Sequence, residues 1–172
     1  TPPSGYLALS TANLPDPAID PAQGSSPEDY FGTVLYSGNS STQAITGVGF
    51  QPDWVWIKSR NTSGSNHVLT DAVRGVSKYL RSNATDAEQD FSAGVTSFDS
   101  DGFTLLQSSS SNEFNVTGRT YVAWNWKANG SGVSNTDGTI TSTVSANTES
   151  GFSIITYTGN GTSGATIGHG LG

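Results

Sequence analysis

Short runs in which apolar and polar residues alternate fill the chain from residue 30 onward. Turn-forming residues such as Gly, Asn, Asp and Ser separate these runs, a pattern typical of β-strands joined by tight turns. We expect strands at residues 31–36, 54–58, 67–73, 94–98, 103–106, 121–126 and 139–144. Such regular short spacing predicts an all-β fold, an antiparallel β-sandwich or jelly roll. One brief helical turn is expected at residues 85–89, with Thr85 as its N-cap.

Residues 1–28 follow a different pattern, because six of the seven prolines of the chain lie there. Proline cannot donate to a β-ladder and favours extended backbone. We therefore predict an extended arm over residues 1–28, followed by a β-sandwich domain over residues 29–149. A solvated linker needs no apolar anchors, so we expect the apolar residues of the arm to be assembly contacts: Tyr6, Leu7, Leu9, Leu14 and Ile19.

The C-terminal part of the chain repeats its first strand region, because residues 31–50 align without a gap on residues 152–171. The matched pairs include Phe31 with Phe152, Tyr36 with Tyr157, Asn39 with Asn160, and Gly49 with Gly170. A low-complexity sequence matches Ser, Gly and Thr by accident, but an aromatic pair and a glycine spacing in one register favour true repetition. Residues 150–172 are therefore predicted to be the start of a second repeat.

One or two strands cannot form a stable sheet by themselves, so this partial repeat needs partners. Two interpretations remain open: the segment begins a second domain, or it is a strand donated to the exposed sheet edge of a neighbouring subunit. In the second case the contacts would be made by Phe152, Ile154, Ile155 and Tyr157.

Several motifs resemble a repeat module of structural and tail-fibre proteins from marine and freshwater phages. They lie at residues 49–58 (GFQPDWVWIK), 71–75, 80–83, 101–104 and 121–127 (YVAWNWK), and residues 1–15 resemble the junction that follows a lectin-like domain in such proteins. The resemblance implies tandem β-modules in a virion or appendage, hence an extracellular or virion-associated location. It brings no catalytic residues with it.

The four tryptophans form two pairs with a spacing of two, so the members of each pair share a sheet face. The pairs are Trp54 with Trp56 and Trp124 with Trp126. One interpretation places at least one pair in the sandwich core, because this polar chain has few other large side chains to pack. The other is a platform on which sugar rings stack.

Composition and charge narrow the range of partners. With a net charge of −7 and only seven Lys and Arg residues, the chain is not expected to bind nucleic acid or an anionic membrane. No apolar run approaches the ~20 residues of a membrane span. The chain has no Cys, which excludes disulfides and thiolate sites, and we expect no cofactor.

The remaining chemistry favours ordinary turns over special sites. Asp99 and Asp101 resemble the start of a calcium loop but lack its distal Glu, so a β-turn is favoured. Two glycosylation sequons stand in predicted turns, at Asn39 and Asn160, in a chain where chance produces several. No motif for a hydrolase, a zinc protease or a phosphate loop is present, and we predict that the chain is not an enzyme.

These observations lead to two hypotheses about function. The first is a structural subunit or module of a phage fibre or extracellular filament, in which neighbouring copies or tandem modules associate by β-strand addition. The second is a carbohydrate-binding adhesion module that recognises host-surface glycans through its tryptophans.

Overall fold

The computed structural model describes residues 4, 16–91, 93–106 and 113–172 of the chain. Two sheets form a β-sandwich, which confirms the all-β prediction. The larger sheet has the strand order β1 (Phe31–Ser37), β9 (Thr120–Trp126), β3 (Trp54–Ser59), β4 (His67–Asp71), β5 (Lys78–Arg81) and β6 (Gln89–Asp90). The smaller sheet has the order β2 (Gln43–Thr46), β8 (Gly102–Leu105) and β7 (Val95–Asp99).

Alternation along the strands builds the core between these two sheets. In β3, Val55 and Ile57 point inward and are almost fully buried, while their neighbours in sequence point to the opposite face. The core contains Tyr36, Ile45, Val55, Ile57, Val68, Tyr79, Val95, Phe103, Leu105, Phe114, Tyr121 and Ala123. Aliphatic and aromatic side chains from both sheets therefore interdigitate, as in other sandwiches.

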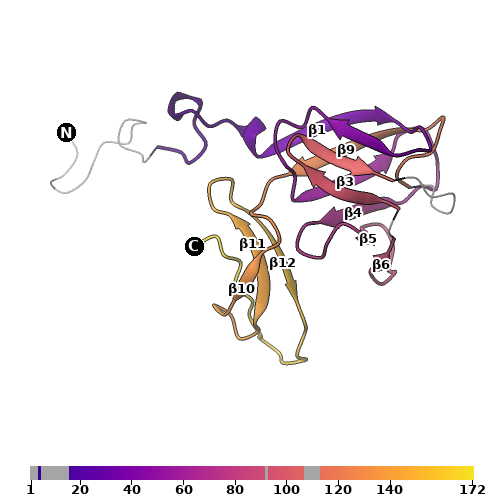
Figure 1. Ribbon diagram of the computed structural model, residues 1–172. Coiled ribbons are helices and arrows are strands. Elements are labelled where there is room, and N and C mark those ends of the chain that lie inside the picture. The colour runs from indigo at the N-terminus through magenta and orange to yellow at the C-terminus, as the bar shows by residue number, and fades with distance from the viewer. Residues whose placement is uncertain (1–3, 5–15, 92, 107–112) are drawn as a thin grey trace.

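A third sheet projects from one side of the sandwich (Figure 1). Its strand order is β10 (Val133–Asn135), β11 (Ser142–Asn147) and β12 (Phe152–Tyr157), and both pairings are antiparallel. The predicted boundary between residues 149 and 150 is wrong, because it cuts the turn of the hairpin that joins β11 to β12. The repeated segment does have a partner strand, as expected, but that partner is β11 of the same chain and not a strand of a neighbouring subunit.

The described part of the N-terminal arm is not uniformly extended. It contains two 3₁₀-helices, η2 (Pro21–Gln23) and η3 (Pro27–Asp29), each with proline in its first turn. The fixed φ of proline suits the start of a helical turn as well as extended backbone. The helical turn expected at residues 85–89 is absent: residues 85–88 form a loop and Gln89 begins β6.

Candidate functional site

The four tryptophans lie on the outer face of the six-stranded sheet. Trp54 stands opposite Trp126 across strands β3 and β9, and Trp56 stands opposite Trp124. All four side chains are half-buried, while the inward positions between them are held by smaller residues such as Val55. The prediction that at least one pair fills the sandwich core is therefore wrong, because the alternation of both strands directs the tryptophans outward.

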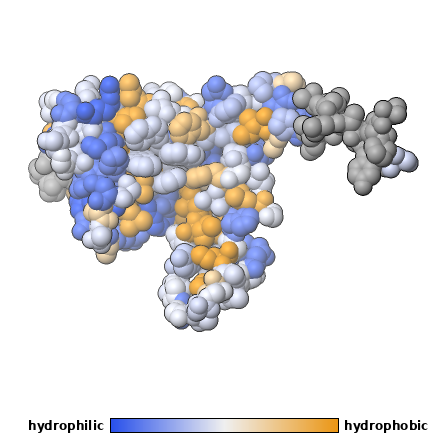
Figure 2. All heavy atoms as spheres, turned by 180° about the vertical axis from the view of Figure 1, so that it is seen from behind, coloured by the Kyte–Doolittle hydropathy of each residue, from blue (hydrophilic) through white to orange (hydrophobic). Residues whose placement is uncertain are grey.

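The third sheet covers one end of this face through Phe152, the first residue of β12. The Phe152 ring stacks on Trp54, with centroids 5.5 Å apart and planes 10° from parallel, and lies 6.1 Å from the Trp126 ring. Phe31 packs against Trp126 as well, at 4.9 Å. The two phenylalanines that match in the sequence repeat thus meet on one tryptophan. Figure 2 shows apolar residues gathered where the third sheet joins the sandwich.

Hydrogen bonds add to this junction. Tyr30 Oη donates to Glu149 Oε2 (2.6 Å) in the turn between β11 and β12, and Asn129 N donates to Ser145 Oγ (2.8 Å) on β11. Ala128 N donates to Asp53 Oδ2 (2.7 Å), which ties the segment after β9 to the residue before β3. Burial raises the pKa of Asp53, and the N–H groups of Ala128 and Gly130 oppose that rise. The third sheet is therefore fastened by directional contacts as well as by stacking.

The other end of the outer face is not covered by the third sheet. There, Trp56 Nε1 donates a hydrogen bond of 3.0 Å to His67 Nδ1, and the Trp124 ring meets the Trp56 ring edge-on at 5.6 Å. Burial, together with the charge of Lys58, lowers the pKa of His67. A neutral imidazole can accept this bond, whereas the protonated ring cannot. Leu35 of β1 is 61% exposed on the same face.

A groove of about 590 Å³ lies between β12 and the outer face of the large sheet. Its apolar wall is formed by Trp54, Leu69, Leu80, Phe152 and Ile154. Leu69 and Leu80 are direct neighbours across β4 and β5. Such a long apolar strip beside an edge strand can receive side chains from another strand.

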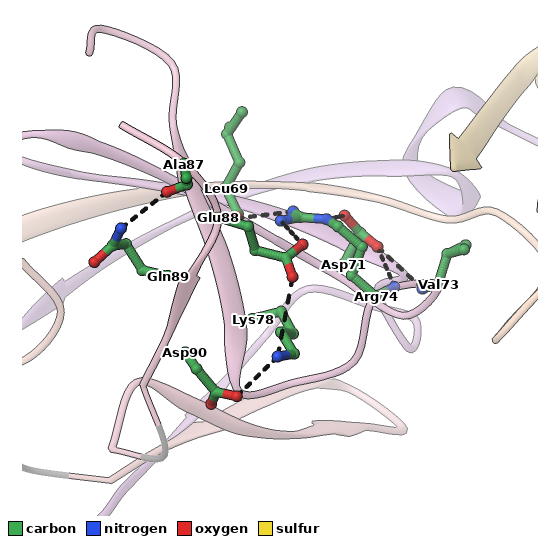
Figure 3. Close-up of polar contacts among 9 residues, drawn as sticks. All are labelled: Leu69, Asp71, Val73, Arg74, Lys78, Ala87, Glu88, Gln89 and Asp90. Carbon is green, nitrogen blue, oxygen red and sulfur yellow. Dashed lines mark hydrogen bonds and ion pairs between the residues drawn. The ribbon is translucent and has the colours of Figure 1, made fainter. Parts of the chain in front are cut away.

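Charged residues also line the groove, namely Asp71, Arg74 and Glu88. Figure 3 shows the polar contacts that they make. Arg74 Nε binds Asp71 Oδ2 at 2.6 Å, and its two terminal nitrogens reach Glu88 (3.4 Å) and the carbonyl oxygen of Leu69 (3.1 Å). Asp71 Oδ1 also accepts hydrogen bonds from the N–H groups of Val73 and Arg74. These charged groups satisfy one another's hydrogen-bonding capacity, and together they form one wall of the groove. Sequence reasoning assigned them no site role, although the i,i+3 spacing of Asp71 and Arg74 was visible.

Strand β12 has one free edge. It is the last strand of its sheet and pairs with β11 alone among the described residues. The last residue of β12, Tyr157, is 55% exposed. The neighbouring strand β11 is approached by the C-terminal segment, since a Cβ built on Gly170 would lie 3.0 Å from Val144 Cγ1.

The two copies of the sequence repeat share local structure. Phe31 begins β1 and Phe152 begins β12. After each strand an asparagine accepts a hydrogen bond of 2.9 Å from the N–H two residues on, Asn39 from Ser41 and Asn160 from Thr162. The matching glycines also agree: φ is 90° at Gly49 and 71° at Gly170. Both sequon asparagines are exposed at these turns.

The repeat copies differ in what surrounds them. Tyr36 is buried, stacks on Tyr121 at 5.0 Å and donates a hydrogen bond of 2.7 Å to the carbonyl oxygen of Phe114. Its equivalent, Tyr157, has no such enclosure and is mostly exposed. β1 is therefore enclosed by the sandwich, whereas β12 is an edge strand of the smaller, three-stranded sheet β10-β11-β12.

The two aspartates weighed as calcium ligands serve turns. Asp101 accepts hydrogen bonds from the N–H groups of Gly49 and Gly47, which lower its pKa, and Asp99 accepts one from the Thr104 hydroxyl. Asp99 pairs with Gly102 across the β7–β8 hairpin, which confirms the β-turn interpretation. Within the ranges that the structure describes, no group of three His, Cys, Asp or Glu side chains could hold a metal ion.

Most of the predicted arm contacts, Tyr6, Leu7, Leu9 and Leu14, lie outside the described residues, while Ile19 is half-buried. Apart from those undescribed stretches, the chain holds no helix long and apolar enough to cross a membrane.

Comparison with known proteins gives one family match. The model of a domain of unknown function, DUF7483, matches residues 26–172, a span that includes all three sheets. No curated protein and no solved structure matches the chain.

Proposed function

We propose that this chain, which belongs to the DUF7483 family, is a structural module that joins neighbouring modules of a fibre or filament by β-strand addition at the free edge of β12. The observation that carries this proposal is an apolar groove beside a strand edge that has no partner among the described residues. The location that fits such a module is extracellular or virion-associated. Its partner is another copy or a tandem module of the same kind.

The free edge of β12 lacks the features by which β-proteins protect their edges. Monomeric proteins place lysines, prolines or very short strands at an exposed edge. β12 has six residues, none of them charged or proline. The β6 edge of the large sheet is different, because β6 has only two residues and Asp90 on it is paired with Lys78 at 2.8 Å.

The groove supplies the specificity that main-chain hydrogen bonds lack. In strand addition the backbone gives affinity, and pockets for alternate side chains select the partner. Phe152 and Ile154 face the groove on one side, and Trp54 lies opposite them. The apolar residues of the N-terminal arm, Tyr6 to Ile19, remain a predicted second contact in the assembly.

A single charged substitution at the free edge tests the proposal. Tyr157→Lys places a positive charge on an exposed position of β12 without removing a buried side chain. Val133→Lys is the matched control, since Val133 is 71% exposed on β10, the other edge of the same sheet. We expect Tyr157→Lys to reduce self-association at least tenfold in sedimentation velocity, with Val133→Lys unchanged. Equal self-association of both variants and the native chain would contradict the proposal.

A second candidate function is glycan binding, which is favoured by the position of Trp56 and Trp124 on the open end of the outer face. Half-exposed indole rings on a sheet face can stack against the C–H groups of a sugar. Trp124→Ala should then abolish binding on an array of host-surface glycans while the circular dichroism spectrum stays native. Native binding by this variant would exclude the platform.

A further inference from the structure

We infer that the partner strand which β12 accepts has the pattern of β9, that is, an antiparallel strand whose alternate positions are aromatic residues. This inference rests on the proposed function, because it names the partner of the same edge. It starts from the repeat: β12 reproduces β1 in its first residue, in the asparagine turn that follows and in the left-handed glycine beyond it.

In the finished sandwich, the strand paired with β1 is β9. The register joins them along their whole length, from Phe31 opposite Trp126 to Ser37 opposite Thr120. Two further bonds extend the ladder at its ends, from Lys127 N to the carbonyl oxygen of Tyr30 and from Gly38 N to that of Arg119. A β9-type strand therefore suits the backbone of β1, and β12 has the same local conformation.

The side chains of such a strand would enter the groove. In the β1–β9 pair, Phe31 and Thr33 stand opposite Trp126 and Trp124, all on one face. The matching positions of β12 are Phe152 and Ile154, which line the groove. The two indole rings of an incoming strand would therefore lie on this face, beside Trp54, Leu69 and Leu80. The apolar character of these two rings matches the apolar wall of the groove.

The test uses a fluorescein-labelled peptide of residues 118–128 and the full-length chain, with binding measured by fluorescence anisotropy. Two control peptides share its length. One carries Trp124→Ser and Trp126→Ser. The other is N-methylated at alternate residues, which removes the N–H donors from the edge that would pair with β12. We expect each control to bind at least tenfold more weakly than the native sequence. The protein variant Tyr157→Lys should weaken binding similarly, and Val133→Lys should not.

The possible results separate the inference about the partner strand from the proposed function of strand addition at β12. Equal binding of the native and Trp-free peptides, or no binding of either, overturns the inference about the partner strand. If a peptide of residues 4–14 binds at the edge that Tyr157→Lys blocks while the β9 peptide does not, the inference fails and strand addition at β12 stands. If Tyr157→Lys also leaves self-association unchanged, the proposed function fails with it.

Discussion

Phe152 lies flat on Trp54, with the two ring planes 10° apart, so the first residue of the C-terminal sheet is stacked on the outer face of the sandwich. This contact sets where β12 stands relative to the groove. Together with the Tyr30–Glu149 and Asn129–Ser145 hydrogen bonds, the stacking holds the free edge beside the apolar wall. A single substitution of Phe152 therefore measures how much this stacking contributes to the stability of the chain.

Phe152→Ala should destabilise the chain by about 2 kcal/mol, less than a fully buried Phe→Ala change, because the side chain is half-buried but stacks on two rings. The measurement is urea denaturation followed by tryptophan fluorescence. Phe31→Ala is the matched control from the first repeat copy. Phe31 is 41% exposed, so its loss should cost about half as much. A larger loss for Phe31→Ala would mean that Phe152 does not anchor the third sheet.

Arg74→Ala should cost about 3 kcal/mol, because Asp71 would stay buried without its cation. The same denaturation assay measures this loss. Lys78→Ala is the control, since its ion pair with Asp90 is exposed and should contribute nothing measurable. Similar stabilities for the two variants would show that the Asp71–Arg74 ion pair does not stabilise this wall of the groove.

Stability should fall as the pH drops below about 6.5, the ordinary value for histidine. The folded chain lowers the pKa of His67, so the protonated ring is favoured in the unfolded chain. The stability that the neutral ring contributes is present above pH 6.5 and is lost as the pH falls through the lower folded pKa. His67→Gln should remove this dependence in urea titrations from about one unit above to about one and a half units below the ordinary histidine pKa, that is, between about pH 7.5 and about pH 5. An unchanged pH profile in this variant would contradict the assignment.

Tyr36→Phe should cost about 1 to 2 kcal/mol at neutral pH, because the buried carbonyl oxygen of Phe114 loses its donor. Burial raises the pKa of Tyr36 well above its ordinary value, so its contribution is present below about pH 10 and is lost at higher pH. The difference between native chain and variant should therefore shrink in strongly alkaline solution. Tyr157→Phe, the same change in the exposed repeat copy, should leave thermal stability unchanged at both pH values.

Much of the fold could be predicted from the sequence. Every run expected to be a strand overlaps one of the observed strands, because period-two alternation and turn residues act locally. The short strands β2, β5, β6 and β10 were missed, since two to four residues carry too little alternation to be distinguished from a loop. The repeat was also visible, because the Phe, Tyr, Asn and Gly positions that define it set local conformation.

Tertiary structure alone decided where those elements stand. The spacing of Trp54 and Trp56 established that they share a face, but whether that face is core or surface depends on which side the second sheet packs. The same limit applies to β12. Its sequence identified it as a copy of the first strand, while its pairing with β11 and its groove facing Leu69 and Leu80 arise from contacts between residues far apart in the chain. Local sequence determined the strands and the repeat; long-range packing determined the free edge.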